Sequence, residues 1–178
     1  MELTAALLDL CKDVEQPIIA IDGPAGAGKT TLASDLTLSL SRFMKVHTLH
    51  MDNYYNGWTS PFDKEWEELL VHAITRHKRA SSLSLKRYDW TAERYSAEVS
   101  EKSAQLLILE GVGSGSAFIR KNLSALIWID IDPELGFSRV IKRDGESIGN
   151  EMRHWLELQE QHFQLNEVEI QADFILTT

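Results

Sequence analysis

Short apolar segments alternate with amphipathic segments along the chain. The apolar segments are rich in β-branched side chains, as expected of strands buried on both faces of a sheet. They predict strands at 17–22, 45–49, 105–109, 125–131 and 173–176, and the helical patterns lie at 3–14, 30–43, 61–78, 115–121, 133–143 and 150–165. Strands that alternate with helices indicate an α/β doubly wound fold around a parallel sheet.

Two local signals refine this pattern. Ser60 can cap the third helix, Pro61 fits its first position, and Asp63 stands where the acid of a capping box belongs. The segment 81–96 alternates like a strand at first and then becomes polar. We interpret it as a flap over the functional site.

Length and composition narrow the class of protein. The 178 residues predict a single domain over 1–178, and 43% hydrophobic with 25% charged residues is typical of a soluble globular protein. The net charge of −9 disfavours a nucleic-acid partner, and the apolar runs are shorter than the about 18 residues of a membrane span. The single cysteine, Cys11, fits a reducing compartment, and Glu2 and Asp9 interrupt any targeting segment, so we expect a cytoplasmic protein. The oligomeric state is left open.

The most specific motif is a glycine-rich loop between the first strand and the second helix. It reads Gly23-Pro24-Ala25-Gly26-Ala27-Gly28-Lys29-Thr30 and matches G-x-x-x-x-G-K-[ST] in full. The glycines let backbone N–H groups turn inward around phosphates, Lys29 adds a full positive charge, and the Thr30 hydroxyl can bind Mg²⁺. We therefore predict that the loop binds the phosphates of a nucleoside triphosphate, with Thr31 as the next residue of the site.

Two further strands end in acids. Glu110 closes the apolar run 106–109, and Asp52 follows the strand at 45–49. Ligands gather at the carboxyl ends of parallel strands, so both side chains are expected beside the phosphates. Glu110 could hold Mg²⁺, and Asp52 could either hold Mg²⁺ or accept the proton of an attacking hydroxyl. The alternatives are a solvent-facing acid at Glu110 and a simple Asp-Asn turn at Asp52.

Later segments supply candidates for charge neutralisation and for acceptor binding. Arg139 and Arg143 are one helical turn apart and could face the γ-phosphate, or could belong to a solvated helix face. The glycines that bracket 145–149 indicate a short lid at about 144–150. The acceptor could contact Tyr88, Asp89 and Arg94, and a planar ring could stack on Tyr88 or Trp90. The alternative is that these aromatic side chains cover the core edge, which fits Trp90 better than Tyr88.

The order of these motifs resembles that of the uridine kinase-like P-loop kinases. The motifs are the phosphate loop, 51–55 (Met-Asp-Asn-Tyr-Tyr), 60–63, 88–90, 109–111 and Arg139 with 142–144. The resemblance implies a five-stranded parallel core, a P-loop NTPase fold, and transfer of the γ-phosphoryl group of ATP to a hydroxyl of a nucleoside-like or sugar-like molecule with Mg²⁺. It makes Asp52 the general base, Glu110 the acid near Mg²⁺, and Arg139 and Arg143 lid-helix arginines, and it places Tyr54 with Tyr88, Asp89 and Arg94 near the acceptor.

The sequence departs from that family at three places. Asn53 stands where the family has a second aspartate, no histidine occurs in 90–94, and 145–149 contains no arginine. The stretch 21–26 (Ile-Asp-Gly-Pro-Ala-Gly) looks instead like the loop of cytidylate kinases. Two alternatives therefore remain, a nucleoside monophosphate kinase of the cytidylate type and a catalytically weak ATP-binding regulatory protein.

Overall fold

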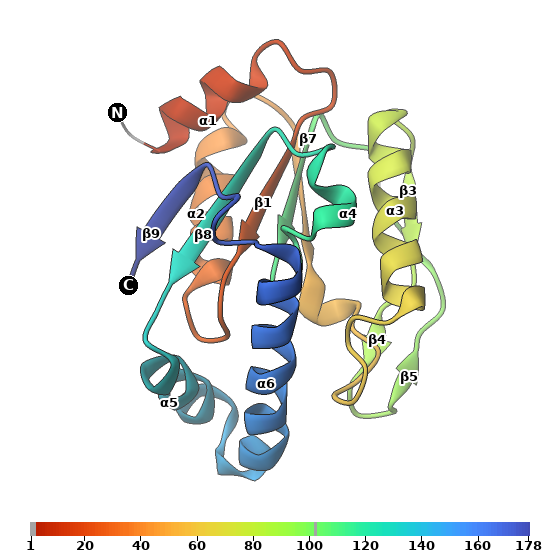
Figure 1. Ribbon diagram of the computed structural model, residues 1–178. Coiled ribbons are helices and arrows are strands. Elements are labelled where there is room, and N and C mark those ends of the chain that lie inside the picture. The colour runs from red at the N-terminus through yellow and green to blue at the C-terminus, as the bar shows by residue number, and fades with distance from the viewer. Residues whose placement is uncertain (1–2, 102) are drawn as a thin grey trace.

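A five-stranded parallel sheet forms the centre of the chain. The computed structural model describes residues 3–101 and 103–178. The sheet has the order β2-β7-β1-β8-β9 (Figure 1). Its strands are β1 (Ile18–Asp22), β2 (Val46–His50), β7 (Leu106–Glu110), β8 (Ala125–Asp130) and β9 (Phe174–Thr177). All neighbouring pairs are parallel, which confirms the predicted doubly wound sheet.

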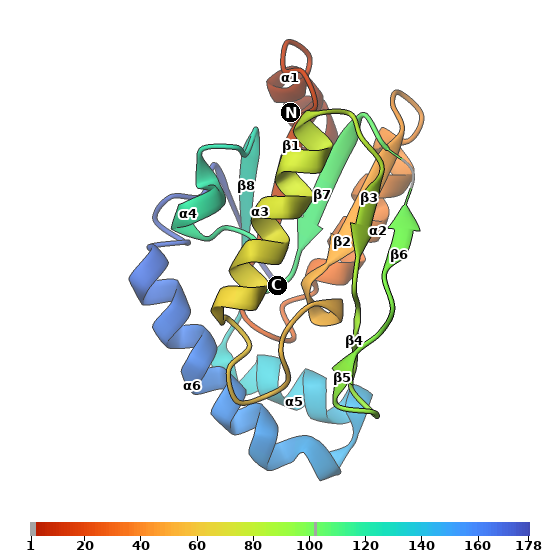
Figure 2. The same ribbon diagram turned by 90° about the vertical axis from the view of Figure 1, so that its right-hand side faces the viewer.

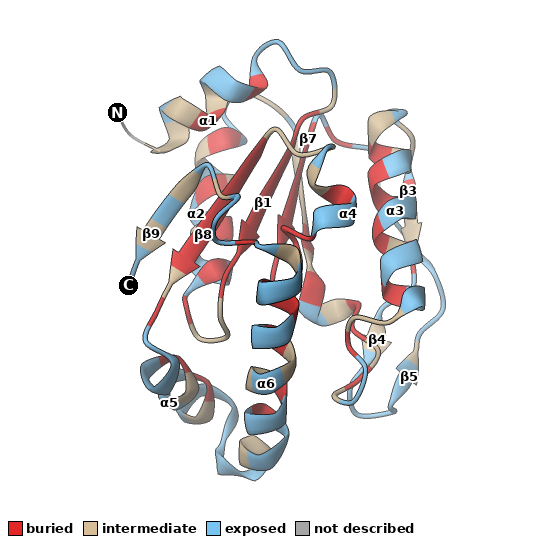
Figure 3. Cartoon of the chain, in the orientation of Figure 1, coloured by how far each residue is buried: buried red, intermediate tan, exposed pale blue. Residues whose placement is uncertain are grey.

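Helices cover both faces of the sheet. They are α1 (Leu3–Cys11), α2 (Lys29–Leu40), α3 (Lys64–Lys78), α4 (Ala117–Arg120), α5 (Pro133–Asp144) and α6 (Gly149–Asn166), with short 3₁₀ turns η1 (Met51–Asn53) and η2 (Glu146–Ile148). Successive strand residues point to opposite faces. Ile19 and Ile21 pack with α1 and α2, while Ile18 and Ala20 share a core with α3, α4 and α6. The central strands are accordingly buried throughout (Figure 3).

The third helix begins later than the sequence predicts. Asp63, rather than Ser60, caps α3, because its carboxylate accepts a hydrogen bond of 2.9 Å from the Trp66 N–H. The Asn56 side chain donates to the other carboxylate oxygen of Asp63 at 2.7 Å. This second contact fixes the aspartate as the cap, so the prediction of a capping box starting at Ser60 was wrong.

The predicted flap at 81–96, together with the residues up to 101, forms two short antiparallel ribbons. β3 (Leu83–Leu85) pairs with β6 (Val99–Glu101), and β4 (Tyr88–Asp89) pairs with β5 (Arg94–Tyr95). The ribbons run beside β2 and α3, with β4 and β5 nearest the carboxyl end of the sheet (Figure 2). In the described part of the chain, no helix is both long and apolar enough to cross a bilayer.

Candidate active site

A cavity of about 620 Å³ lies at the carboxyl end of the sheet. It is bounded by the glycine-rich loop, η1, the end of β7, α5 and the first half of α6, and in Figure 1 the arrows of β1 and β8 point toward it. The residues that line it are Ala25, Gly26, Gly28, Lys29, Thr30, Thr31, Asp52, Tyr55, Trp58, Trp90, Glu110, Val112, Arg139, Val140, Arg143, Asp144, Ile148, Met152 and Trp155. Five elements distant in sequence thus converge on one space, where α/β proteins usually bind ligands.

The glycine-rich loop has a backbone that only glycine accommodates at its key positions. Gly23, Gly26 and Gly28 have φ angles of 139°, 79° and 90°. A Cβ atom on Gly23 would lie 2.3 Å from the Ile129 carbonyl oxygen, and one on Gly26 would lie 2.3 Å from the Gly136 carbonyl oxygen. The loop is therefore packed closely against β8 and α5. Such a glycine-rich turn at a helix N-terminus can present N–H groups to an anion.

Lys29 is held at the mouth of this loop. Its ammonium group donates hydrogen bonds of 2.7 Å to the carbonyl oxygens of Gly23 and Pro24. Burial lowers the pKa of Lys29, and the nearby carboxylates of Asp22 and Glu110 partly offset that effect. An ammonium group fixed in this way on the cavity wall can neutralise phosphate charge.

Glu110 and Thr30 form a polar pair at the base of the cavity. The Thr30 hydroxyl donates to Glu110 Oε1 at 3.1 Å, and His50 Nδ1 lies 2.6 Å from Glu110 Oε2. The hydrogen bond to the Glu110 carboxylate raises the pKa of His50. In the described residues no cluster of three or more metal-ligating side chains occurs. Mg²⁺ usually takes only one or two carboxylates together with substrate phosphates and waters, so a carboxylate beside a hydroxyl fits this ion.

Asp52 belongs to a part of the cavity wall that is separate from the phosphate loop. It is part of η1, directly after β2, and its carboxylate faces the cavity, where it remains accessible to solvent. Protein surrounds the group on most sides, and this burial raises the pKa of Asp52, while the charge of Lys29 opposes the rise. The indole N–H of Trp90 donates to the Asp52 carbonyl oxygen at 2.9 Å and holds the turn in place. A carboxylate with a raised pKa is suited to accept a proton.

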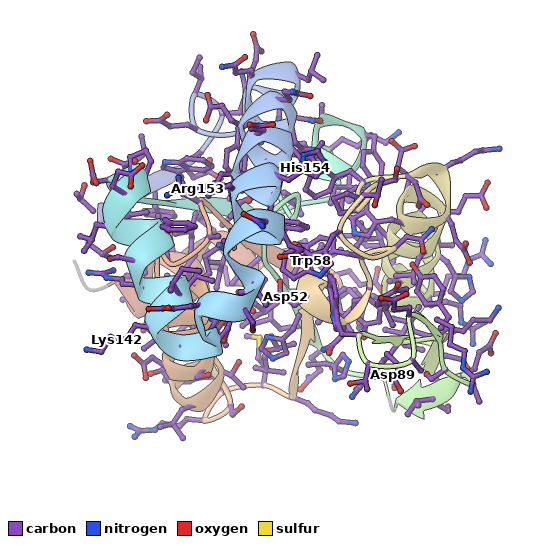
Figure 4. The ribbon with its side chains drawn as sticks, turned by 90° about the horizontal axis from the view of Figure 1, so that it is seen from below. Asp52, Trp58, Asp89, Lys142, Arg153 and His154 are labelled. Atoms are coloured by element: carbon purple, nitrogen blue, oxygen red, sulfur yellow. The ribbon has the colours of Figure 1, made fainter. Side chains whose placement is uncertain are left out.

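Aromatic side chains form the wall next to Asp52. Trp58 contacts Trp90 with ring centroids 5.1 Å apart, and Trp155 contacts Tyr55 at 4.8 Å and Trp58 at 6.0 Å. In Figure 4, Asp52 and Trp58 lie close together beside α6. We call Tyr55, Trp58, Trp90 and Trp155 the aromatic wall. Its flat surfaces can hold a planar or apolar part of a ligand.

Sequence reasoning missed most of this wall. Sequence patterns do not single out Trp58 or Trp155, and they favour Tyr88 over Trp90 as the stacking surface, yet Trp58, Trp90 and Trp155 line the cavity and Tyr88 does not. A tryptophan next to a motif looks the same in sequence whether it faces a core or a cavity. The available signal was weak: Trp155 shares a helical stripe with Met152 and Gln159, all three of them buried.

The two arginines of α5 reach the cavity in different ways. Arg139 Nη1 lies 3.4 Å from the Gly26 carbonyl oxygen. Arg143 makes two hydrogen bonds of 2.7 Å to the carboxylate of its neighbour Asp144. Both guanidinium groups are exposed on the cavity side of α5, and Ile148 from the predicted lid at 144–150 lines the same space.

Four predicted acceptor residues lie outside the cavity lining. The Tyr54 side chain is buried, and the Tyr88 ring packs against Trp90 and Tyr95. Asp89 Oδ1 accepts the N–H groups of Thr91 and Ala92 and closes a turn. Asp89 and Arg94 pair across β4 and β5. Asp89 lies away from Asp52 in Figure 4. The cavity-facing residue of this flap is Trp90.

Two buried polar side chains support the phosphate loop from outside the cavity. Gln159 of α6 accepts a hydrogen bond of 3.1 Å from the Ala25 N–H. Asp22, at the end of β1, is fully buried and accepts the Gly23 N–H at 2.8 Å. Within the loop, Ala27 is itself fully buried. The cradle is therefore fixed to the sheet and to α6.

Comparison with known proteins places this site in context. No family model matches the chain. A uridine kinase of Lactobacillus helveticus is 26% identical over 154 residues, which cover 78% of this chain and 73% of that protein. A uridine kinase of Mycoplasma genitalium is 29% identical over 161 residues, with 79% and 74% covered.

The fold has counterparts among solved structures. A protein from Bacillus stearothermophilus described as a possible uridine kinase superposes with a TM-score of 0.69 at 22% identity, covering 99% of this chain and 100% of that one. Together with the sequence relatives, this match confirms the resemblance indicated by the order of the motifs.

Proposed function

We propose that this chain, a uridine kinase-like P-loop kinase by sequence and fold, transfers the γ-phosphoryl group of ATP to a hydroxyl of a nucleoside-like or sugar-like molecule. One observation carries the proposal: Asp52, Lys29, Thr30 and Glu110 line a single cavity. A base for the hydroxyl, a cation for the phosphates and ligands for Mg²⁺ are the parts that phosphoryl transfer requires.

The reaction assigns a separate task to each group. The hydroxyl oxygen of the acceptor forms a bond to the γ-phosphorus, the bond from that phosphorus to the β–γ bridging oxygen breaks, and ADP leaves. Asp52 takes the hydroxyl proton. Lys29, Arg139 and Arg143 neutralise charge on the phosphates, and Thr30 and Glu110 would hold Mg²⁺, which supplies further charge neutralisation when bound.

The aromatic wall supports a nucleoside-like acceptor over a simple sugar. Trp58, Trp90 and Trp155 line the cavity together with Asp52 and contribute mostly apolar aromatic surface. A planar base gains from such a surface, whereas a polyhydroxyl compound leaves its polar groups unpaired there. The sequence relatives named uridine kinase agree with this preference.

The proposal is tested by a screen for acceptor-dependent ADP release with ATP and Mg²⁺. Nucleosides, sugars and nucleoside monophosphates are compared, and the product is identified by mass spectrometry. We expect Asp52→Asn to abolish transfer and to leave ATP affinity nearly unchanged, because the loop stays intact. Asp35→Asn, the same substitution on the exposed face of α2, is the control and should transfer normally.

Other outcomes distinguish the alternative functions. Turnover with CMP but not with nucleosides would favour the cytidylate type of kinase, which the stretch 21–26 resembles. ATP binding without turnover on any acceptor would favour a regulatory ATP-binding protein. Normal transfer by Asp52→Asn would refute the role of that residue as the base.

A further inference from the structure

A buried carboxylate outside the cavity connects two segments that border it, the phosphate loop and the residues that follow β7. Asp22 is fully buried and lies between the phosphate loop and the segment 111–116, which follows β7 and leads into α4. Its Oδ1 atom accepts from Gly23 at 2.8 Å and Gly113 at 3.2 Å, and its Oδ2 atom accepts from Gly113 at 3.1 Å and Gly115 at 2.8 Å. Three backbone N–H groups from two loops thus share one side chain.

The segment 111–116 continues from Asp22 to the aromatic wall. Val112 lines the cavity, and its carbonyl oxygen accepts a hydrogen bond of 2.8 Å from the hydroxyl of Tyr55, which also lines the cavity. Gly113 has a φ of 88°, and a Cβ atom there would lie 2.8 Å from the Trp66 ring. The segment is therefore packed closely against α3, and its hydrogen bonds to Asp22 connect it to the phosphate loop.

We propose that Asp22 is a positioning residue that fixes the acceptor side of the cavity, through Val112 and Tyr55, relative to the phosphate loop. The proposal rests on the kinase function given above. It follows from a continuous path of contacts: Gly23 of the loop, Asp22, Gly113, Val112 and Tyr55. We call this path of contacts the Asp22 brace. A misplacement of reacting groups by about 1 Å can lower the rate about 100-fold, so the brace can affect the rate of phosphoryl transfer although Asp22 does not touch the substrate.

The chemistry of the site requires a carboxylate. An asparagine has the same shape but only one acceptor oxygen, and its NH₂ group would face backbone N–H donors. Burial raises the pKa of Asp22 to about 6, while the hydrogen bonds from Gly115, Gly23 and Gly113 and the charge of Lys29 lower it. The group is therefore mostly ionised at neutral pH and can accept all these hydrogen bonds.

The test compares Asp22→Asn with a matched control in the same segment. We expect Asp22→Asn to lower kcat/KM for the acceptor by about 10- to 100-fold, with an unchanged Kd for ATP by calorimetry. Ser114→Ala removes another buried hydrogen bond, 2.9 Å from the Ser114 hydroxyl to the Ile21 carbonyl oxygen, between the same segment and the same strand. It should leave both quantities near wild type. An equal loss in Ser114→Ala would overturn the proposal.

A double-mutant cycle asks whether Asp22 acts through the wall. Tyr55→Phe removes the hydrogen bond to Val112, so it should lower kcat/KM in the same direction. If both residues act through one segment, the loss in the double variant is smaller than the product of the two single losses. Losses that simply multiply would refute the path. Should Asp22→Asn fail to fold, Asp22→Ser replaces it with the same expectations, since its smaller side chain leaves room for water.

A readout independent of turnover separates this inference from the kinase function. Amide hydrogen exchange over 51–58, which contains Tyr55, should increase in Asp22→Asn and not in Ser114→Ala. If the wild type shows no acceptor-dependent turnover, the kinase proposal is refuted. The exchange measurement still tests whether Asp22 fixes the segment that contains Tyr55. Unchanged exchange in Asp22→Asn would overturn the brace even in an active kinase.

Discussion

His162 makes the stability of the fold depend on pH. This residue of α6 is 9% exposed, its ring packs against Phe62 with centroids 4.3 Å apart, and its Nε2 atom lies 2.9 Å from the Ser116 hydroxyl. Burial lowers the pKa of His162 from 6.5 to about 4. Each unit of pKa difference is worth about 1.4 kcal/mol, so the folded state prefers the neutral ring by about 3 kcal/mol.

The sign of this effect follows from the lowered pKa. His162 makes its full contribution to the free energy of unfolding above the pKa of the unfolded state, about 6.5, and this contribution is lost as the pH falls toward 4. Between pH 7.5 and 4.5 the loss is about 2.5 kcal/mol, a large share of the about 5–15 kcal/mol of a typical domain.

Urea unfolding at the two pH values measures this loss. His162→Phe keeps a ring beside Phe62 but cannot take a proton, so its unfolding free energy should fall by about 2.5 kcal/mol less than that of the wild type. The control is His154→Phe, on the same helix with 51% of the side chain exposed, which should follow the wild type. Parallel pH dependence in wild type and His162→Phe would refute the reasoning.

Three further predictions concern the phosphate loop and its support. Lys29→Ala should weaken ATP binding about 10- to 100-fold by calorimetry, because it removes a charge-assisted hydrogen bond. Gly26→Ala should also weaken ATP binding, since its positive φ and the 2.3 Å approach to the Gly136 carbonyl oxygen force the loop to move. Asp22 has the opposite effect to His162, because its raised pKa adds to the unfolding free energy below about pH 4 and this addition is lost as the pH rises to about 6. Between these pH values the unfolding free energy should decrease by up to about 3 kcal/mol more in the wild type than in Asp22→Asn.

The architecture was predictable because its signals are local. Each buried strand is a short apolar run, and the glycine-rich loop is recognised from the spacing of its glycines, lysine and threonine. The start of α3 was placed wrongly because Ser60 and Asp63 are both good caps. The contact that decides between them, from Asn56 to Asp63, depends on the tertiary path of the preceding turn.

The polar half of the site was easier to anticipate than its apolar half. Glu110 and Asp52 end strands, and strand ends meet at one edge of a parallel sheet. Whether Trp58 or Tyr88 faces the cavity depends on how the flap folds back, and no periodicity reports that. Asp22 was overlooked because its partners Gly113 and Gly115 lie 91 and 93 positions away in sequence.

The hydrogen bond between Gln159 and Ala25 has a mechanical consequence for α6. This bond attaches the later turns of the 18-residue helix to the phosphate loop, whereas Ile148 and Met152, which precede Gln159 in sequence, border the cavity. A swing of the whole helix as a rigid rod would break this bond. We therefore expect any hinge that closes the residues at 144–150 over bound substrates to lie ahead of Gln159, within the first turns of α6.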